Sequence, residues 1–69
     1  MRPNGLAIRA IRTAQKMSLR ELEEHTGLNR GYLSRMERGR IRESADELVR
    51  KVANALDVIP EAITHKEKT

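Results

Sequence analysis

Arginines are the residues whose type and spacing most clearly suggest a chemical role in this sequence, namely the binding of anions. Five of them lie between positions 30 and 42, while acidic residues dominate the flanking stretches 21–24 and 43–47. The net charge is only +4, yet the pI is about 10.1 because most basic residues are arginine. A basic patch on a mixed surface favours a polyanionic partner, and a merely solvated charged face is the alternative. The five are Arg30, Arg35, Arg38, Arg40 and Arg42.

Catalytic chemistry has little support. The histidines, His25 and His65, lie far apart, and neither has the neighbouring residue pattern of a metal site or an activated nucleophile. The absence of cysteine excludes disulfides, thiolate sites and thiol nucleophiles. The sequence therefore predicts no enzyme, no cofactor, no metal site and no small-molecule ligand.

The length allows one domain, over residues 1–69, with a core at about 5–63 and a frayed tail at 65–69. Strand formers are sparse and Tyr32 is the one aromatic residue, which favours an all-α, compact bundle of four to five short helices. No apolar run approaches the roughly 20 residues of a membrane span, and no signal-peptide pattern is present. We expect a cytoplasmic protein without membrane contact.

Local signals place the helices. The first is expected at about 5–16, after a short arm. Ser18 and Glu21 form a capping box that opens a second helix, and Gly27 suits the left-handed turn that ends it. Asn29 can cap a third helix that ends before Gly39.

Downstream of the arginines, the sequence predicts one full helix and one short one. A second capping box, Ser44 to Glu47, predicts a helix over about 44–55 with one apolar face. Pro60 is tolerated in a first helical turn and predicts a short helix at 60–64. The expected core residues of the full helix are Leu48, Val52 and Leu56.

The stretch 18–38 predicts a helix-turn-helix. The connection between its helices is so short that one face of the second helix, with Leu33 and Met36, must pack inward. An α-helix fits the major groove of B-DNA, where arginine can pair with guanine and asparagine with adenine. The recognition helix is therefore expected at about Asn29–Arg38. Its outward residues are Arg30, Gly31, Ser34 and Arg35.

Four segments, in this order and spacing, resemble the lambda-repressor-like (Cro-type, XRE) helix-turn-helix domain. The resemblance spans about 5–63. It implies a domain of five helices and a sequence-specific regulator of transcription on double-stranded DNA, such as a repressor or phage-type control protein. The segments are Ser18–Leu22, Thr26–Leu28, Tyr32–Gly39 and Val52–Val58.

The resemblance also implies roles for single residues. It makes Arg12 and Glu37 a partly buried ion pair with a structural role, despite their charges. With the outward-facing residues added, the expected base contacts are Asn29, Arg30, Gly31, Ser34 and Arg35. The expected phosphate contacts are Ser18, Leu19, Arg20, Tyr32, Arg38, Arg40 and Arg42.

Some positions depart from the family pattern. Leu19 stands where many members carry glutamine, so the polar interaction of that glutamine is missing or passes to Arg20. Glu23 replaces a small residue and needs a partner, for which we expect Arg30 or a backbone group of the recognition helix. We hypothesise that Glu23 orients Arg30.

Tyr32 has two possible roles. It either reaches a phosphate, which we favour, or covers the junction of the two helices.

Two questions stay open in the sequence. A protein-binding helix-turn-helix module, such as an antitoxin or anti-repressor, is the main alternative function, because Val58, Ile59 and Ile63 could form a small apolar patch. RNA binding is a weaker alternative, since single-strand readers rely on stacking aromatic residues. We expect a monomer or weak homodimer that pairs on DNA through the segment Val58–Ile63.

Overall fold

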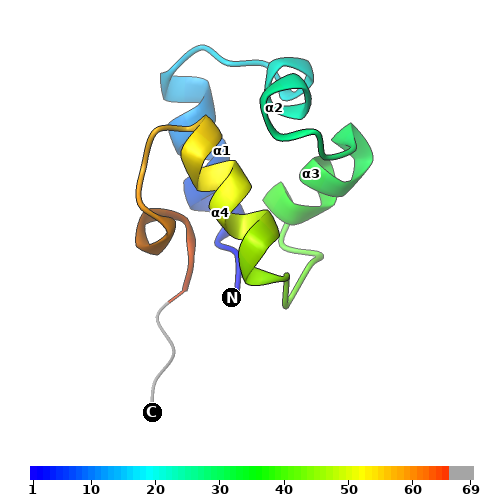
Figure 1. Cartoon of the computed structure of the whole chain (residues 1–69), viewed down its shortest axis with the longest axis vertical. Coiled ribbons are helices and arrows are strands. Elements are labelled where there is room, and N and C mark those ends of the chain that lie inside the picture. The colour runs from blue at the N-terminus through cyan, green and yellow to red at the C-terminus, as the bar shows by residue number, and fades with distance from the viewer. Residues whose placement is uncertain (66–69) are drawn as a thin grey trace.

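The computed structural model describes residues 1–65 of the chain. Four α-helices precede one short 3₁₀ helix, and α4 crosses the middle of the molecule with α1 behind it (Figure 1). This arrangement confirms the predicted all-α bundle. The elements are α1 (Gly5–Ala14), α2 (Leu19–Thr26), α3 (Arg30–Glu37), α4 (Asp46–Ala55) and η1 (Pro60–Ile63).

The caps of the helix-turn-helix form as predicted. The Ser18 hydroxyl accepts a hydrogen bond from the Glu21 amide, and the Glu21 carboxylate accepts one from the Ser18 amide, both at 3.0 Å. Gly27 ends α2 with φ at +75°, a conformation that glycine adopts without steric cost. The Asn29 side chain then accepts the Gly31 amide at 2.7 Å and opens α3. Local chemistry alone thus fixes this turn.

Two helix boundaries differ from the prediction. α1 ends at Ala14 rather than at position 16, because Lys16 turns into the left-handed region with φ at +57°. α4 begins at Asp46, and its N-cap Ala45 makes no side-chain hydrogen bond. The predicted capping box at Ser44 is therefore wrong: Ser44 is buried and lies within 2.8 Å of the Tyr32 hydroxyl instead.

The core gathers one apolar face from every helix. Its α4 members lie at Val49, Val52, Ala53 and Leu56, the i, i+3, i+4, i+7 pattern of an amphipathic helix. Val52 and Leu56 are buried as expected, whereas Leu48 is only half-buried at the edge of this face, and Val49 lies in the core instead. Ile8, Leu22, Leu33, Met36 and Ile63 complete the buried set.

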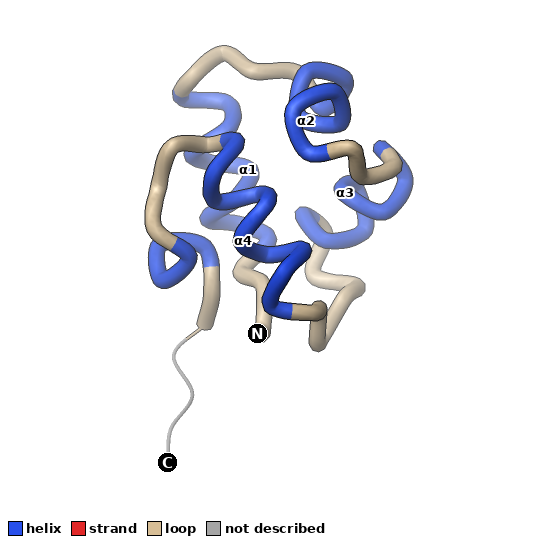
Figure 2. Tube along the Cα trace, in the orientation of Figure 1, coloured by secondary structure: helices blue, strands red, loops and turns tan. Residues whose placement is uncertain are grey.

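The N-terminal segment is bound to the C-terminal end of the domain rather than forming a free arm. The Asn4 amide donates to the Ile63 carbonyl at 2.8 Å, and the His65 amide donates to the Arg2 carbonyl at 2.9 Å. The frayed tail predicted over 65–69 stays a prediction: residues 66–69 lie outside the described residues, and His65 makes the hydrogen bond just given. Figure 2 shows the two segments as neighbouring tan stretches, one leading into α1 and the other leaving η1. Within residues 1–65, no helix has the length and apolar character that a membrane span requires.

Candidate nucleic-acid interface

The outer face of α3 is polar and accessible. Leu33, Met36 and Glu37 are buried against the rest of the domain, so the helix has a fixed rotation about its axis. This rotation leaves Arg30, Gly31 and Arg35 exposed and Ser34 half-buried. The helix therefore presents one arginine near its start and one near its end on its exposed side, while its other side packs on the core.

Asn29 and Gly31 lie together at the start of this face. The Asn29 side-chain oxygen is engaged by the Gly31 amide, which leaves the side-chain NH₂ group to donate outward. A Cβ atom at position 31 would lie 2.9 Å from that oxygen and 3.7 Å from Nη1 of Arg35. A side chain here would press only on the Asn29 oxygen and would make an ordinary van der Waals contact with Arg35.

Glu23 connects α2 to the first residue of α3. One carboxylate oxygen accepts the Arg30 backbone amide at 3.1 Å, and the other lies 3.3 Å from Nε of Arg30. From the sequence, the expected partner of Glu23 was either Arg30 or a backbone group of the recognition helix. Arg30 supplies both, through its guanidinium and its backbone amide. The carboxylate satisfies an otherwise unpaired amide of the first helical turn and pairs the Arg30 guanidinium with α2.

Replacing Glu23 with alanine should relax base preference at the position read by Arg30 more than it lowers stability. The pair is more than a third exposed at Arg30, so the cost in unfolding free energy should stay within about 1 kcal/mol. Selection of binding sites with the variant and thermal unfolding of the same sample measure both effects. An unchanged site preference would contradict the orienting role of Glu23.

Most of the predicted phosphate-contact residues are accessible, with Leu19 and Tyr32 as the exceptions. Arg20, Arg38, Arg40 and Arg42 are all exposed, and so is Ser18 at the start of α2. The Leu19 side chain is half-buried and packs against the core, so it has no polar group to offer a phosphate. Any phosphate contact at the start of α2 must therefore be made by the backbone or by Arg20.

Tyr32 makes a contact that was not predicted from the sequence, where the alternatives were a phosphate contact and a ring that covers the junction of α2 and α3. Its ring packs against the core, and its hydroxyl lies 2.8 Å from the Ser44 hydroxyl in the loop before α4. The residue therefore ties α3 to that loop. A phosphate contact by this hydroxyl would have to share or replace the bond to Ser44.

The ion pair implied by the family resemblance is formed. Nε of Arg12 donates to one oxygen of Glu37 at 2.6 Å and Nη2 donates to the other at 3.0 Å. A third bond runs from Nη1 to the Met17 carbonyl at 2.8 Å. The Glu37 carboxylate raises the pKa of Arg12 through these hydrogen bonds. The pair locks α1 to the end of α3 and leaves neither charge for a ligand.

Sequence reasoning missed Arg9 of α1. It lines one pocket together with Arg38 and Arg42 of the loop after α3. Helical periodicity marks Arg9 as exposed, because Ile8 beside it faces the core. The periodicity gives no sign that a loop about thirty residues later lies next to it.

Comparison with known proteins identifies this arrangement. A family model described as Helix-turn-helix matches residues 8–62, which include all of α2, α3 and α4. The chain belongs to the lambda-repressor-like (XRE) helix-turn-helix family. The resemblance stated from the four segments is thereby confirmed.

Relatives and solved structures agree with that membership. An HTH-type transcriptional regulator of Sinorhizobium fredii, y4dL, is 47% identical over 51 residues, which are 74% of this chain and 26% of the relative. The restriction-modification controller protein C.AhdI of Aeromonas hydrophila is 36% identical, with a TM-score of 0.78 over 84% of this chain and 86% of that one. The biofilm regulator SinR, solved in complex with DNA, is 33% identical, with a TM-score of 0.77 over 83% and 90%. This chain spans about a quarter of the length of the Sinorhizobium relative.

Proposed function

We propose that this chain is a sequence-specific, double-stranded DNA-binding regulator of transcription that places α3 in the major groove. The observation that carries the proposal is the outer face of α3, where Arg30 and Arg35 stand exposed on a helix whose rotation is fixed by three buried residues. Arginine forks on a rigid helix match the acceptor pair of guanine. The relatives, which are regulators and in one case a regulator bound to DNA, support the same function.

In this proposal, the contacts divide into two kinds. Asn29, Arg30 and Arg35 read base edges, while Arg20, Arg38, Arg40 and Arg42 contact phosphates without reading sequence. Gly31 lets the helix backbone approach the groove, and Ser34 adds a hydroxyl at its edge.

Pairing on DNA is the expected mode of assembly. Of the segment proposed for dimerisation, Ile63 is fully buried, Val58 is half-buried and packs on the core, and Ile59 alone is a large exposed apolar residue, at 65%. This surface is far smaller than the roughly 800 Å² per partner of a stable interface. Two copies are therefore proposed to meet on adjacent half-sites, through an interface too weak to hold a dimer in free solution.

The two kinds of contact predict different effects of mutation. Arg35→Ala should weaken binding to the preferred site by about 1–3 kcal/mol and relax the motif at one position. Arg40→Ala should weaken binding to all sequences alike and reduce the salt dependence. Binding titrations on preferred and scrambled duplexes measure the contrast. Equal loss of affinity on both duplexes for both variants would contradict base reading by α3.

A further inference from the structure

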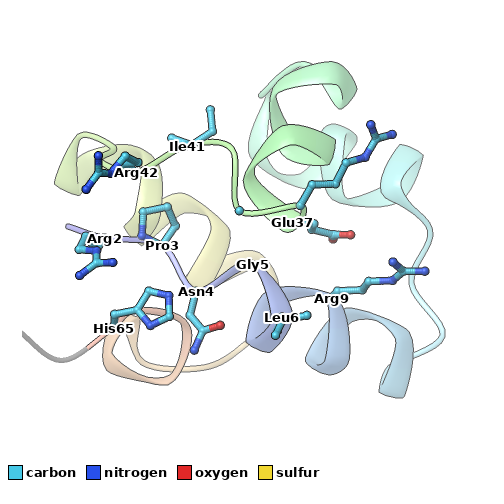
Figure 3. A pocket seen from close by; sticks show the side chains of 12 residues that line it. Arg2, Pro3, Asn4, Gly5, Leu6, Arg9, Glu37, Ile41, Arg42 and His65 are labelled. Atoms are coloured by element: carbon cyan, nitrogen blue, oxygen red, sulfur yellow. The ribbon is translucent and has the colours of Figure 1, made fainter.

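An open pocket of about 530 Å³ lies at the junction of the N-terminal segment, the first turns of α1 and the loop after α3. Figure 3 shows Arg2, Arg42 and His65 at one side of it and Arg9 at the other, along α1. Arg38 completes the set of basic side chains that line the pocket. Arginines from three separate parts of the chain thus surround one depression.

The positive charge of this pocket is uncompensated within the described residues. Among residues 1–65, no ion pair involves Arg2, Arg9, Arg38 or Arg42. In the same range, Glu37 is the one carboxylate lining the pocket, and its two oxygens are already taken by Arg12. Several cationic side chains around one depression, none of them in an ion pair within that range, favour an anionic ligand.

The lining also offers apolar surface between the cations. Leu6 is 80% exposed, and Ile41 and Pro3 also line the pocket. A nucleic-acid backbone alternates charged phosphates with weakly polar sugars. This alternation matches a DNA strand better than it matches a free phosphate, which needs donors on all sides.

The position of the pocket at the end of α3 supports the same ligand. α3 has eight residues and is therefore about 12 Å long, which equals the approximate width of the major groove. If the start of α3 reads base edges, its end lies at the wall of the groove, where one sugar-phosphate strand passes. Arg38 directly follows α3 and opens onto the pocket.

We propose that this pocket binds the DNA backbone just outside the bases read by α3, with Arg9 and Arg2 as phosphate contacts in addition to Arg38 and Arg42. This inference rests on the proposed function and adds α1 and the N-terminal segment to the interface. The bound DNA is then longer than the stretch that the recognition helix covers.

Salt titration of three variants tests the proposal. Arg9→Gln and Arg2→Gln each remove one cation of the pocket, and Arg50→Gln removes an exposed arginine of α4 outside it. Removing one arginine–phosphate interaction should reduce the slope of log K against log salt by about 0.9, or about fivefold in affinity near 0.15 M salt. Arg9→Gln and Arg2→Gln should show this reduction with an unchanged motif, whereas Arg50→Gln should bind like the parent chain. On a duplex trimmed to the motif, the difference between the parent chain and Arg9→Gln should disappear.

Other outcomes overturn the proposal in distinguishable ways. If the parent chain selects a DNA motif but Arg9→Gln has the affinity and slope of Arg50→Gln, the pocket does not touch DNA and the proposed function stands. If Arg9→Gln loses binding of inorganic tripolyphosphate, measured by calorimetry, while its DNA slope is unchanged, the pocket takes a free anion instead. If the parent chain selects no DNA at all, the proposed function itself has failed.

Discussion

Gly5→Ala is expected to lower the free energy of unfolding by about 3 kcal/mol. Gly5 is buried at the start of α1, and a Cβ atom there would overlap the carbonyl oxygens of Met36 and Glu37. It would also lie 2.6 Å from the carbonyl carbon of Glu37. Since these are backbone atoms, no side-chain rotation relieves the overlap, and α1 must move away from the end of α3.

Gly31→Ala is the matched control for this variant. The same methyl group at position 31 meets only the Asn29 and Arg35 side chains, and alanine gains up to about 1 kcal/mol of helix propensity over glycine. Its unfolding free energy should therefore stay within about 1 kcal/mol of the parent value. Chemical denaturation of the three proteins measures the difference. A Gly5→Ala protein as stable as Gly31→Ala would show that α1 and α3 do not pack as closely as described.

Loss of one partner of the Arg12–Glu37 pair is the second large effect. The Arg12 and Glu37 side chains are 12% and 6% exposed, so either charge left alone is mostly cut off from water. Arg12→Met or Glu37→Met should each lower the unfolding free energy by about 3–5 kcal/mol. The orphaned carboxylate or guanidinium, rather than the missing attraction, accounts for most of that cost.

The double variant separates this cause from a simple loss of packing. With both residues changed to methionine, no charge remains buried at this pair, and the total loss should fall below the sum of the single losses by about 2 kcal/mol or more. A double-mutant cycle by chemical denaturation gives this coupling. Additive losses would contradict a coupled, desolvated pair.

Local signals made the helix-turn-helix predictable from the sequence. The Ser18–Glu21 capping box, the left-handed turn at Gly27 and the cap at Asn29 each involve residues within four positions of one another, so the chain encodes them directly. The inward direction of Leu33 and Met36 followed from the same short turn. These features are confirmed almost to the residue.

Contacts between distant segments were not predictable in the same way. The burial of Ser44 depends on Tyr32, twelve residues earlier, and the anchoring of Asn4 depends on Ile63. A Ser-x-x-Glu pattern cannot reveal that the serine is engaged elsewhere. The same limit hid Arg9 from the candidate site, because its relation to the loop after α3 exists only in the folded domain.

Glu23 was an intermediate case. Its departure from the family pattern indicated a need for a partner before the structure showed Arg30 in that place. The sequence could name the candidates because only the start of the recognition helix lies within reach of the end of α2. It could not show that one residue supplies both the amide and the guanidinium.

The most direct test of DNA reading by α3 is selection of binding sites from a random duplex library at about 150 mM salt, followed by a salt titration of the best site. We predict recovery of a two-fold-related motif and a slope of log K against log salt of about −4 per bound protomer from the four phosphate-contacting arginines, or about −5 if Arg2 and Arg9 also contact phosphates. The motif would show that α3 reads bases, and the slope would show that the arginines around it contact phosphates. Recovery of no motif, with binding that disappears at moderate salt, would contradict the proposed function and indicate that the exposed face of α3 serves a protein partner.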